Sequence, residues 1–152
     1  MSTNDLSVRP LNPAHSGRIV ELVQLLNPKL RAEVLVDRLR QQWALEGYHI
    51  FGLFREERLI GVASGWVSIR LYGGKLAELD NVIVDPADRG AGTGTFFLTE
   101  LETFFKGIGC RRIELKTYTG NKRSHRFYHR NDFSIYAFYF VKEIHEDDGE
   151  DY

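Results

Sequence analysis

The chain has 152 residues, which suits one domain and is enough to build a substantial hydrophobic core. Its 20 Lys and Arg residues are balanced by 21 Asp and Glu residues, so it lacks the excess positive charge of most nucleic-acid-binding domains. Its one cysteine, Cys110, excludes an intrachain disulfide. We see no secretory signal pattern and no apolar run long enough to span a bilayer. These features predict a single cytoplasmic domain over residues 1–152, with an acidic tail at 143–152 and neither nucleic acid nor membrane as partner.

The first third of the chain predicts a short strand followed by two helices. Apolar residues at 6–11 indicate the strand. Asn12 and Pro13 then supply a good N-cap and a proline at the first helical position, which predicts a helix through residue 26. A second amphipathic helix is expected over 35–43.

From Tyr48 onward the apolar residues take the spacing of strands. We expect strands at 49–54, 59–70 and 76–84, with a glycine turn between the last two, and these strands form an antiparallel meander.

The rest of the chain returns to alternating helices and strands. Apolar residues at helical spacing predict a helix over 95–105, and alternation predicts a strand at 111–117. A short helix at 121–130 and one or two closing strands at 133–141 complete the order. This order predicts an α/β fold, with helices on both faces of a mixed sheet.

A glycine-rich loop joins the last strand of the meander to the next helix. Residues 85–94 read Asp-Pro-Ala-Asp-Arg-Gly-Ala-Gly-Thr-Gly, and Gly90, Gly92 and Gly94 place no Cβ between a ligand and the backbone. Free N–H groups and the positive end of the helix dipole then favour an anion, most often a phosphate. A flexible turn without a ligand is the alternative. Thr95 stands where a dinucleotide fingerprint needs its third glycine, and the Gly-Lys-Ser/Thr of a P-loop is absent.

Two motifs resemble those of the GNAT N-acyltransferase superfamily. The pyrophosphate loop of that family, Arg/Gln-x-x-Gly-x-Gly/Ala, is matched by Arg89, Gly92 and Gly94. Its second motif, Asn-x-x-Ala-x-x-Phe-Tyr-x-x-x-Gly-Phe, keeps its spacing here with Ser in place of Ala and Asp in place of Gly. The matching residues are Asn121, Ser124, Phe127, Tyr128, Asp132 and Phe133. The order of elements resembles the family along essentially the whole chain.

The resemblance implies a fold, a donor and a set of ligands. The fold would be the GNAT acyl-CoA N-acyltransferase fold, with about six to seven strands and about four helices. The activity would be transfer of an acetyl group from acetyl-CoA to an amine of a small molecule or peptide, by direct attack in a ternary complex and without a metal. The implied coenzyme A ligands are Val82, Ile83, Val84, Arg89, Gly90, Ala91, Gly92, Thr93, Gly94 and Asn121. N-capping of a helix explains Asn121 equally well.

Three side chains are candidates for the proton transfers. Tyr128 resembles the general acid of the family, which protonates the departing thiolate, although a packed aromatic is its structural alternative. Glu78 and Asp80 lie two apart on one strand, so both should project from the same face, with Asn81 on the other. Either carboxylate, or a water molecule, could serve as the base. A solvent-exposed pair without a catalytic role is the alternative.

Other functions and partners stay open at this stage. A non-catalytic acyl-CoA-binding or regulatory module with the same fold is the main alternative. Either a monomer or a homodimer is compatible with the sequence. His125 and His129 have the four-residue spacing of a two-histidine metal pair, but no third ligand is evident, so we predict solvated histidines and no metal.

Overall fold

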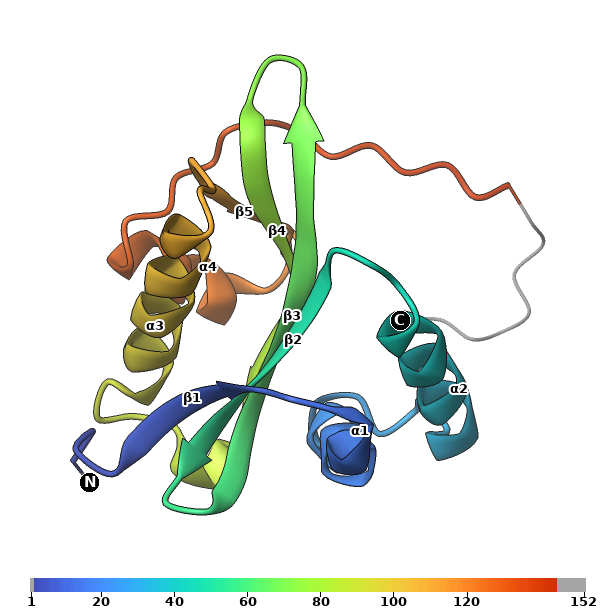
Figure 1. The fold of residues 1–152 in the computed structure, drawn as a ribbon, viewed down its shortest axis with the longest axis vertical. Coiled ribbons are helices and arrows are strands. Elements are labelled where there is room, and N and C mark those ends of the chain that lie inside the picture. The colour runs from blue at the N-terminus through green and yellow to red at the C-terminus, as the bar shows by residue number, and fades with distance from the viewer. Residues whose placement is uncertain (1, 145–152) are drawn as a thin grey trace. The chain divides into compact units, whose positions relative to one another are not determined.

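The computed structural model describes residues 2–144, and Figure 1 shows its elements. The chain divides into two compact units, one up to Glu114 and one from Leu115 onward. Within the described residues, no helix is both long and apolar enough to cross a membrane.

The first unit is built on a sheet with the strand order β1-β2-β3-β4-β5. The strands are β1 (Leu6–Pro10), β2 (Tyr48–Arg55), β3 (Arg58–Arg70), β4 (Gly74–Val84) and β5 (Ile113–Leu115). The first four are antiparallel to their neighbours, as the predicted meander requires. Next to β4, the Arg111 amide donates to the Lys75 carbonyl at 2.8 Å and the Ala77 amide donates to the Arg112 carbonyl at 3.1 Å. Because residue numbers increase in the same direction along both segments, β5 is parallel to β4, and the sheet is mixed.

Helices cover both faces of this sheet (Figure 1). The predicted capping at Asn12 is confirmed, since its side chain accepts from the Ala14 amide at the start of a 3-10 turn that leads into α1 (Ser16–Leu26). Next come α2 (Ala32–Trp43) and, after the glycine loop, α3 (Thr93–Gly107). Strand alternation separates two cores: Ile50 packs in the cluster with α1 and α2, whereas Phe51 lies 4.7 Å from the ring of Phe104 on α3.

The second unit contains α4 (Lys122–Arg130). Asn121 caps it by accepting the Ser124 amide at 3.1 Å, which confirms the capping interpretation. The motif's Asp132 has a φ of +64°, a left-handed conformation that Asp tolerates better than most residues. Residues 145–152, most of the predicted acidic tail, lie outside the described residues.

One strand prediction is wrong, and another gave a strand that is too long. Residues 133–144 form no strand, and their apolar side chains are largely exposed, Phe138 at 90%. The strand expected at 111–117 is only three residues long. The described chain therefore has five strands instead of six to seven. Aromatic and β-branched residues favour strands, but a strand also needs a neighbour to pair with, and local composition does not supply one.

Candidate active site

The glycine loop follows β4 directly and begins with a 3-10 turn, η2 (Pro86–Asp88). Three successive residues after the turn have positive φ: Gly90 at +95°, Ala91 at +49° and Gly92 at +81°. A Cβ on Gly90 or on Gly92 would meet no atom within 4 Å. These glycines are therefore required for their backbone conformation, and the space in front of them is open.

The start of α3 presents free amides to that space. Gly92 is its N-cap and has no side chain to accept a hydrogen bond. The Thr93 amide and hydroxyl both donate to the Gly90 carbonyl, at 3.0 and 2.8 Å, so Thr93 holds the turn itself. Among residues 2–144, the amides of Gly94 and Thr95 have no acceptor. This end of the helix fits an anionic group, because its free N–H groups and its dipole both favour negative charge.

Two aspartates at the two ends of η2 anchor the loop: Asp85 is its N-cap and Asp88 is its last residue. Asp85 accepts the Ala87 amide at 3.0 Å and Arg18 Nη2 at 2.8 Å, and these partners hold the pKa of Asp85 below its ordinary value. Asp88 is 2% exposed and accepts from Arg55 Nε at 3.1 Å and from both Nη atoms of Arg58 at 2.9 Å. The sequence analysis missed Asp88, because its partners lie thirty or more residues away on the β2–β3 hairpin.

We expect Asp88→Asn to destabilise the fold and the loop together. The amide keeps one acceptor but loses the charge-assisted bonds, so the free energy of unfolding should fall by about 2 kcal/mol. Denaturant titration measures this change. The matched control is Asp37→Asn on α2, where the carboxylate is exposed and, among the described residues, accepts from Arg40 and Gln41 of its own helix. An equal loss of stability in both variants would contradict the anchoring role of Asp88.

The edge of β4 that faces away from β3, here called its outer edge, presents backbone N–H and C=O groups at every second residue. The Asp85 amide donates to the carbonyl of Ile60, the residue directly opposite, at 2.8 Å. By alternation, Ile83 also directs its backbone groups toward β3, whereas Val82 and Val84 direct theirs to the other edge. The Val84 carbonyl there accepts Arg89 Nε at 2.9 Å. Of the three predicted β4 ligands, only Val82 and Val84 thus have backbone groups on this edge.

A β-bulge interrupts β4 at the predicted catalytic residues. Ser64 of β3 is opposite Asn81, but the next residue, Gly65, is opposite Leu79, so Asp80 is the extra residue. Gly65 permits the bulge, because a Cβ there would overlap the carbonyl oxygen of Glu78 and lie 2.9 Å from Leu79 Cα.

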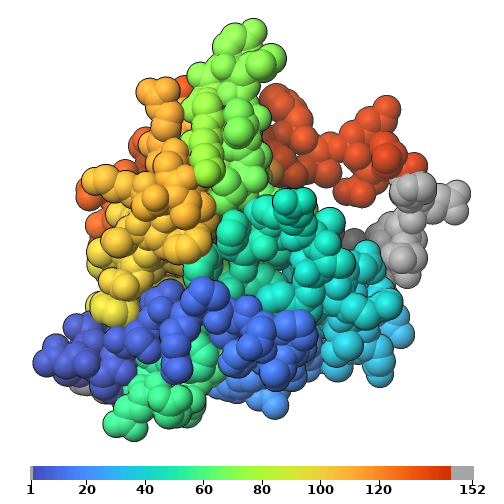
Figure 2. Space-filling model, viewed as in Figure 1, coloured from blue at the N-terminus to red at the C-terminus, as the bar shows by residue number. Residues whose placement is uncertain are grey.

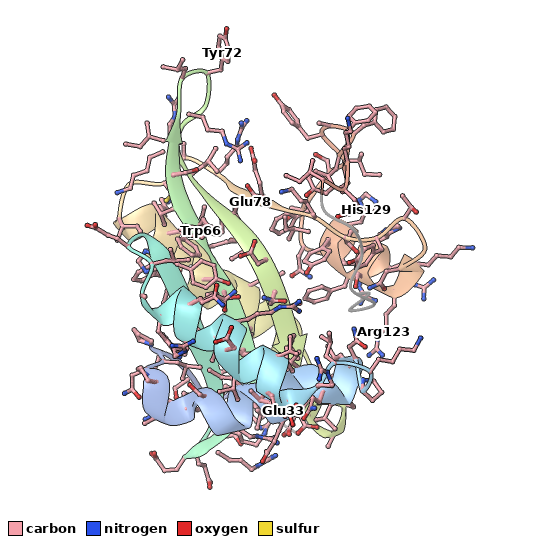
Figure 3. All side chains as sticks on the ribbon, turned by 90° about the vertical axis from the view of Figure 1, so that its right-hand side faces the viewer. Glu33, Trp66, Tyr72, Glu78, Arg123 and His129 are labelled. Atoms are coloured by element: carbon pink, nitrogen blue, oxygen red, sulfur yellow. The ribbon has the colours of Figure 1, made fainter. Side chains whose placement is uncertain are left out.

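The bulge corrects the prediction that Asn81 projects away from Glu78. The Asn81 side chain donates to Ser64 Oγ at 2.9 Å, and Glu78 is opposite Trp66, two residues further along the same face of β3. Figure 3 shows Trp66 and Glu78 on these neighbouring strands. The extra residue shifts the alternation by one, so Asn81 joins the face of Glu78.

The two carboxylates have different surroundings. Glu78 is partly buried and pairs with Arg70 at 2.8 Å, and Arg70 also pairs with Glu114 at 2.9 Å. Asp80 is exposed. Burial raises the pKa of Tyr48, and the nearby negative charge of Asp80 raises it further. The face thus combines one carboxylate held in an ion pair with one that is exposed and hydrogen-bonded to the half-buried Tyr48 hydroxyl.

The remaining predicted residues belong to the second unit. Tyr128 packs between Phe127 and Phe133, with ring centroids 5.3 and 5.5 Å away, and burial raises the pKa of Tyr128. A ring nitrogen of His125 lies 2.8 Å from the Tyr118 carbonyl oxygen, and one of His129 lies 3.1 Å from that of Phe133. In the described part of the chain, no three His, Cys, Asp or Glu side chains gather as metal ligands.

Known proteins share this architecture. The model of the acetyltransferase (GNAT) family matches residues 18–133, whereas no curated protein matches the sequence. Aminoglycoside N-acetyltransferase AAC(6')-Iy in complex with CoA is 17% identical over 91% of this chain and 95% of that chain, with a TM-score of 0.78. A Trypanosoma brucei acetyltransferase is 23% identical over 92% and 100%, with a TM-score of 0.71. A Bacillus halodurans transcriptional regulator is 18% identical over 91% and 99%, with a TM-score of 0.80. The predicted fold class is confirmed, and the chain belongs to the acetyltransferase (GNAT) family.

Proposed function

We propose that the protein transfers an acetyl group from acetyl-CoA to an amine of a small molecule or peptide by direct attack in a ternary complex. One observation carries the proposal: the loop at Gly90 and Gly92 leaves the first amides of α3 open to an anion. Membership of the family supports coenzyme A as that anion, and AAC(6')-Iy, which has the same fold, was crystallised with CoA.

In this proposal the loop residues, Arg89 to Gly94 in the sequence, hold the pyrophosphate of coenzyme A. The pantetheine arm runs along the outer edge of β4, where Val82 and Val84 offer backbone groups. Asn121, besides capping α4, contributes a side-chain hydrogen bond to the arm. No metal is needed, because the loop amides supply the positive potential.

The chemistry moves protons at both the amine and the thiolate. An amine acceptor is mostly protonated at neutral pH and must lose a proton to a base, directly or through water, before its lone pair attacks the thioester carbonyl. The nitrogen that has attacked then gives up its surplus proton to water as the carbon–sulfur bond breaks. The departing thiolate takes a proton from Tyr128, which regains one from solvent. We assign the base role to Asp80 in preference to Glu78, because Asp80 is the more exposed of the two and Glu78 forms an ion pair with Arg70.

We expect the two carboxylates to respond differently to neutralisation. Asp80→Asn should lower kcat/KM for the acceptor about 100-fold, within the usual range for loss of a general base. Glu78→Gln should lower it less than about tenfold, because this change chiefly breaks an ion pair. Steady-state kinetics on both variants measures the difference. The reverse order would move the base role to Glu78, and two small effects would leave water as the base.

We expect Tyr128→Phe to slow transfer without weakening donor binding. Loss of the acid should lower kcat about 100-fold, whereas the dissociation constant of acetyl-CoA should stay within about twofold. Because burial raises the pKa of Tyr128, the protonated, acid-competent form persists above pH of about 10, the ordinary pKa of tyrosine. The wild-type pH–rate profile should therefore show no loss of activity from Tyr128 below that pH. Unchanged kcat in the variant would remove Tyr128 from the acid role.

The acceptor is tested by a panel of amines. A small-molecule amine is the first choice and a peptide amine the second, and the panel should include aminoglycosides because proteins of this fold are named for them. Thiol release measures turnover, and calorimetry with coenzyme A measures donor binding. Transfer to any amine supports the proposed enzyme. Coenzyme A binding without turnover on the whole panel would instead favour a non-catalytic acyl-CoA-binding module.

A further inference from the structure

A chain of polar side chains crosses the face of the sheet and ends at the bulge. Gln42 Nε2, on α2, donates to the Tyr48 hydroxyl at 3.0 Å. The Tyr48 hydroxyl donates to Ser64 Oγ at 2.9 Å, and Asn81 Nδ2 donates to the same oxygen at 2.9 Å. Side chains from one helix and three strands therefore form one chain of hydrogen bonds, and its last member, Asn81, is adjacent to Asp80.

Ser64 is the centre of this chain. It is 4% exposed, and it belongs to the last regular pair of the β3–β4 ladder before the bulge. Leaving its oxygen without donors would carry the full cost of a buried, unsatisfied polar group. Tyr48 is also fixed by its ring, which packs edge-on against Trp66 with centroids 4.9 Å apart.

A bulge needs support of this kind. Asp80 is the extra residue in the register of the ladder, so the regular alternation of a strand does not determine how its side chain is aimed. Asn81 is the first paired residue after Asp80 in the chain, and its side-chain hydrogen bond to Ser64 fixes the strand at that point. The hydroxyl of Tyr48 in turn holds Ser64 in the rotamer that accepts from Asn81.

We propose that Tyr48 and Ser64 are positioning residues that hold the Asp80 bulge in the orientation from which its carboxylate takes a proton from the acceptor amine. The inference rests on the proposed function, in which Asp80 is the base. Tyr48 and Ser64 take no part in the proton transfer. Ser64 acts through Asn81 and the backbone of β4, and Tyr48 acts through Ser64 and also through its own hydrogen bond with the Asp80 carboxylate.

The test uses Tyr48→Phe, which keeps the ring against Trp66 and removes only the hydroxyl. In the full chain, backbone amides of the bulge should exchange with solvent roughly tenfold faster, the size of effect expected for one buried hydrogen bond. Calorimetry with coenzyme A counts the active sites, and kcat calculated per site should fall roughly tenfold. The KM for acetyl-CoA should be unchanged. The control is Tyr72→Phe at the tip of the β3–β4 hairpin, which stands clear of the rest of the first unit at the top of Figure 2. The side chain of Tyr72 projects into solvent there (Figure 3), and no effect is expected.

A second variant separates a relay from two independent contacts. Ser64→Ala should produce changes in the same direction, and the double variant should lose less than the sum of the two single losses, because both substitutions break the same chain while only Tyr48→Phe also removes the hydrogen bond with Asp80. Additive losses, or bulge amides that exchange at the wild-type rate in Tyr48→Phe, would overturn the inference while leaving the proposed function intact. Faster exchange in a protein whose wild type transfers acetyl to no amine would instead defeat the proposed function and leave the anchoring of the bulge standing.

Discussion

Gly92→Val should abolish coenzyme A binding while the protein still folds. A valine side chain would project into the open space in front of the loop, where a Cβ meets no protein atom within 4 Å. It would also strain the backbone, because Gly92 has a φ of +81° and a β-branched residue strongly disfavours that region. We expect affinity for coenzyme A to fall at least about 100-fold, or about 2.7 kcal/mol, as measured by calorimetry.

The same substitution at the other end of α3 is the matched control. Gly107 also has no atom within 4 Å of an added Cβ, and its φ is not in the left-handed region. Gly107→Val should therefore bind coenzyme A normally. Circular dichroism of both variants checks that the fold survives. Normal binding by a folded Gly92→Val would show that the loop is not the phosphate site.

Gly65→Ala should have the largest effect on stability and should remove activity with it. The new Cβ would overlap the carbonyl oxygen of Glu78, and neither strand can retreat without breaking the β3–β4 ladder. Backbone overlap at a close-packed position costs at least about 3 kcal/mol when the chain cannot relax. If it relaxes instead by losing the bulge, Asp80 turns to another face and transfer stops.

Gly17→Ala on α1 provides the comparison. An added Cβ there meets nothing within 4 Å, and alanine is favoured over glycine in a helix by up to about 1 kcal/mol. Thermal unfolding should therefore shift upward for Gly17→Ala and sharply downward for Gly65→Ala. A Gly65→Ala protein as stable and as active as the wild type would show that the close approach at the bulge is not needed.

Local patterns were sufficient for most of the elements. The spacing of apolar residues, the cap at Asn12 and the turn near Gly74 predicted α1 and the three-strand meander nearly at their observed bounds. These signals are local, because a helix or hairpin is favoured by residues only a few positions apart. The same reasoning failed at residues 133–141, where strand-forming side chains have no strand to pair with in the described structure.

Some features of the candidate site could likewise be predicted from local sequence, and others could not. The glycines of the loop could be interpreted from the sequence, because positive φ and a helix start depend on the residues of the loop itself. The face of Asn81 could not, since the alternation rule assumes a regular strand and the bulge at Asp80 shifts it by one residue. Nor could the relay from Tyr48 to Ser64, whose members lie sixteen residues apart.

The sequence by itself therefore determined the family, the α/β fold and the loop on which the proposed donor site rests. Only the tertiary structure decided how the two carboxylates of β4 differ and which buried groups support them. The reason is physical: a glycine loop and an amphipathic helix are specified by neighbours in the chain. The aim of Asp80 and the ion pair of Glu78 depend instead on Gly65, Ser64 and Arg70, which reach β4 only after β3 has paired with it.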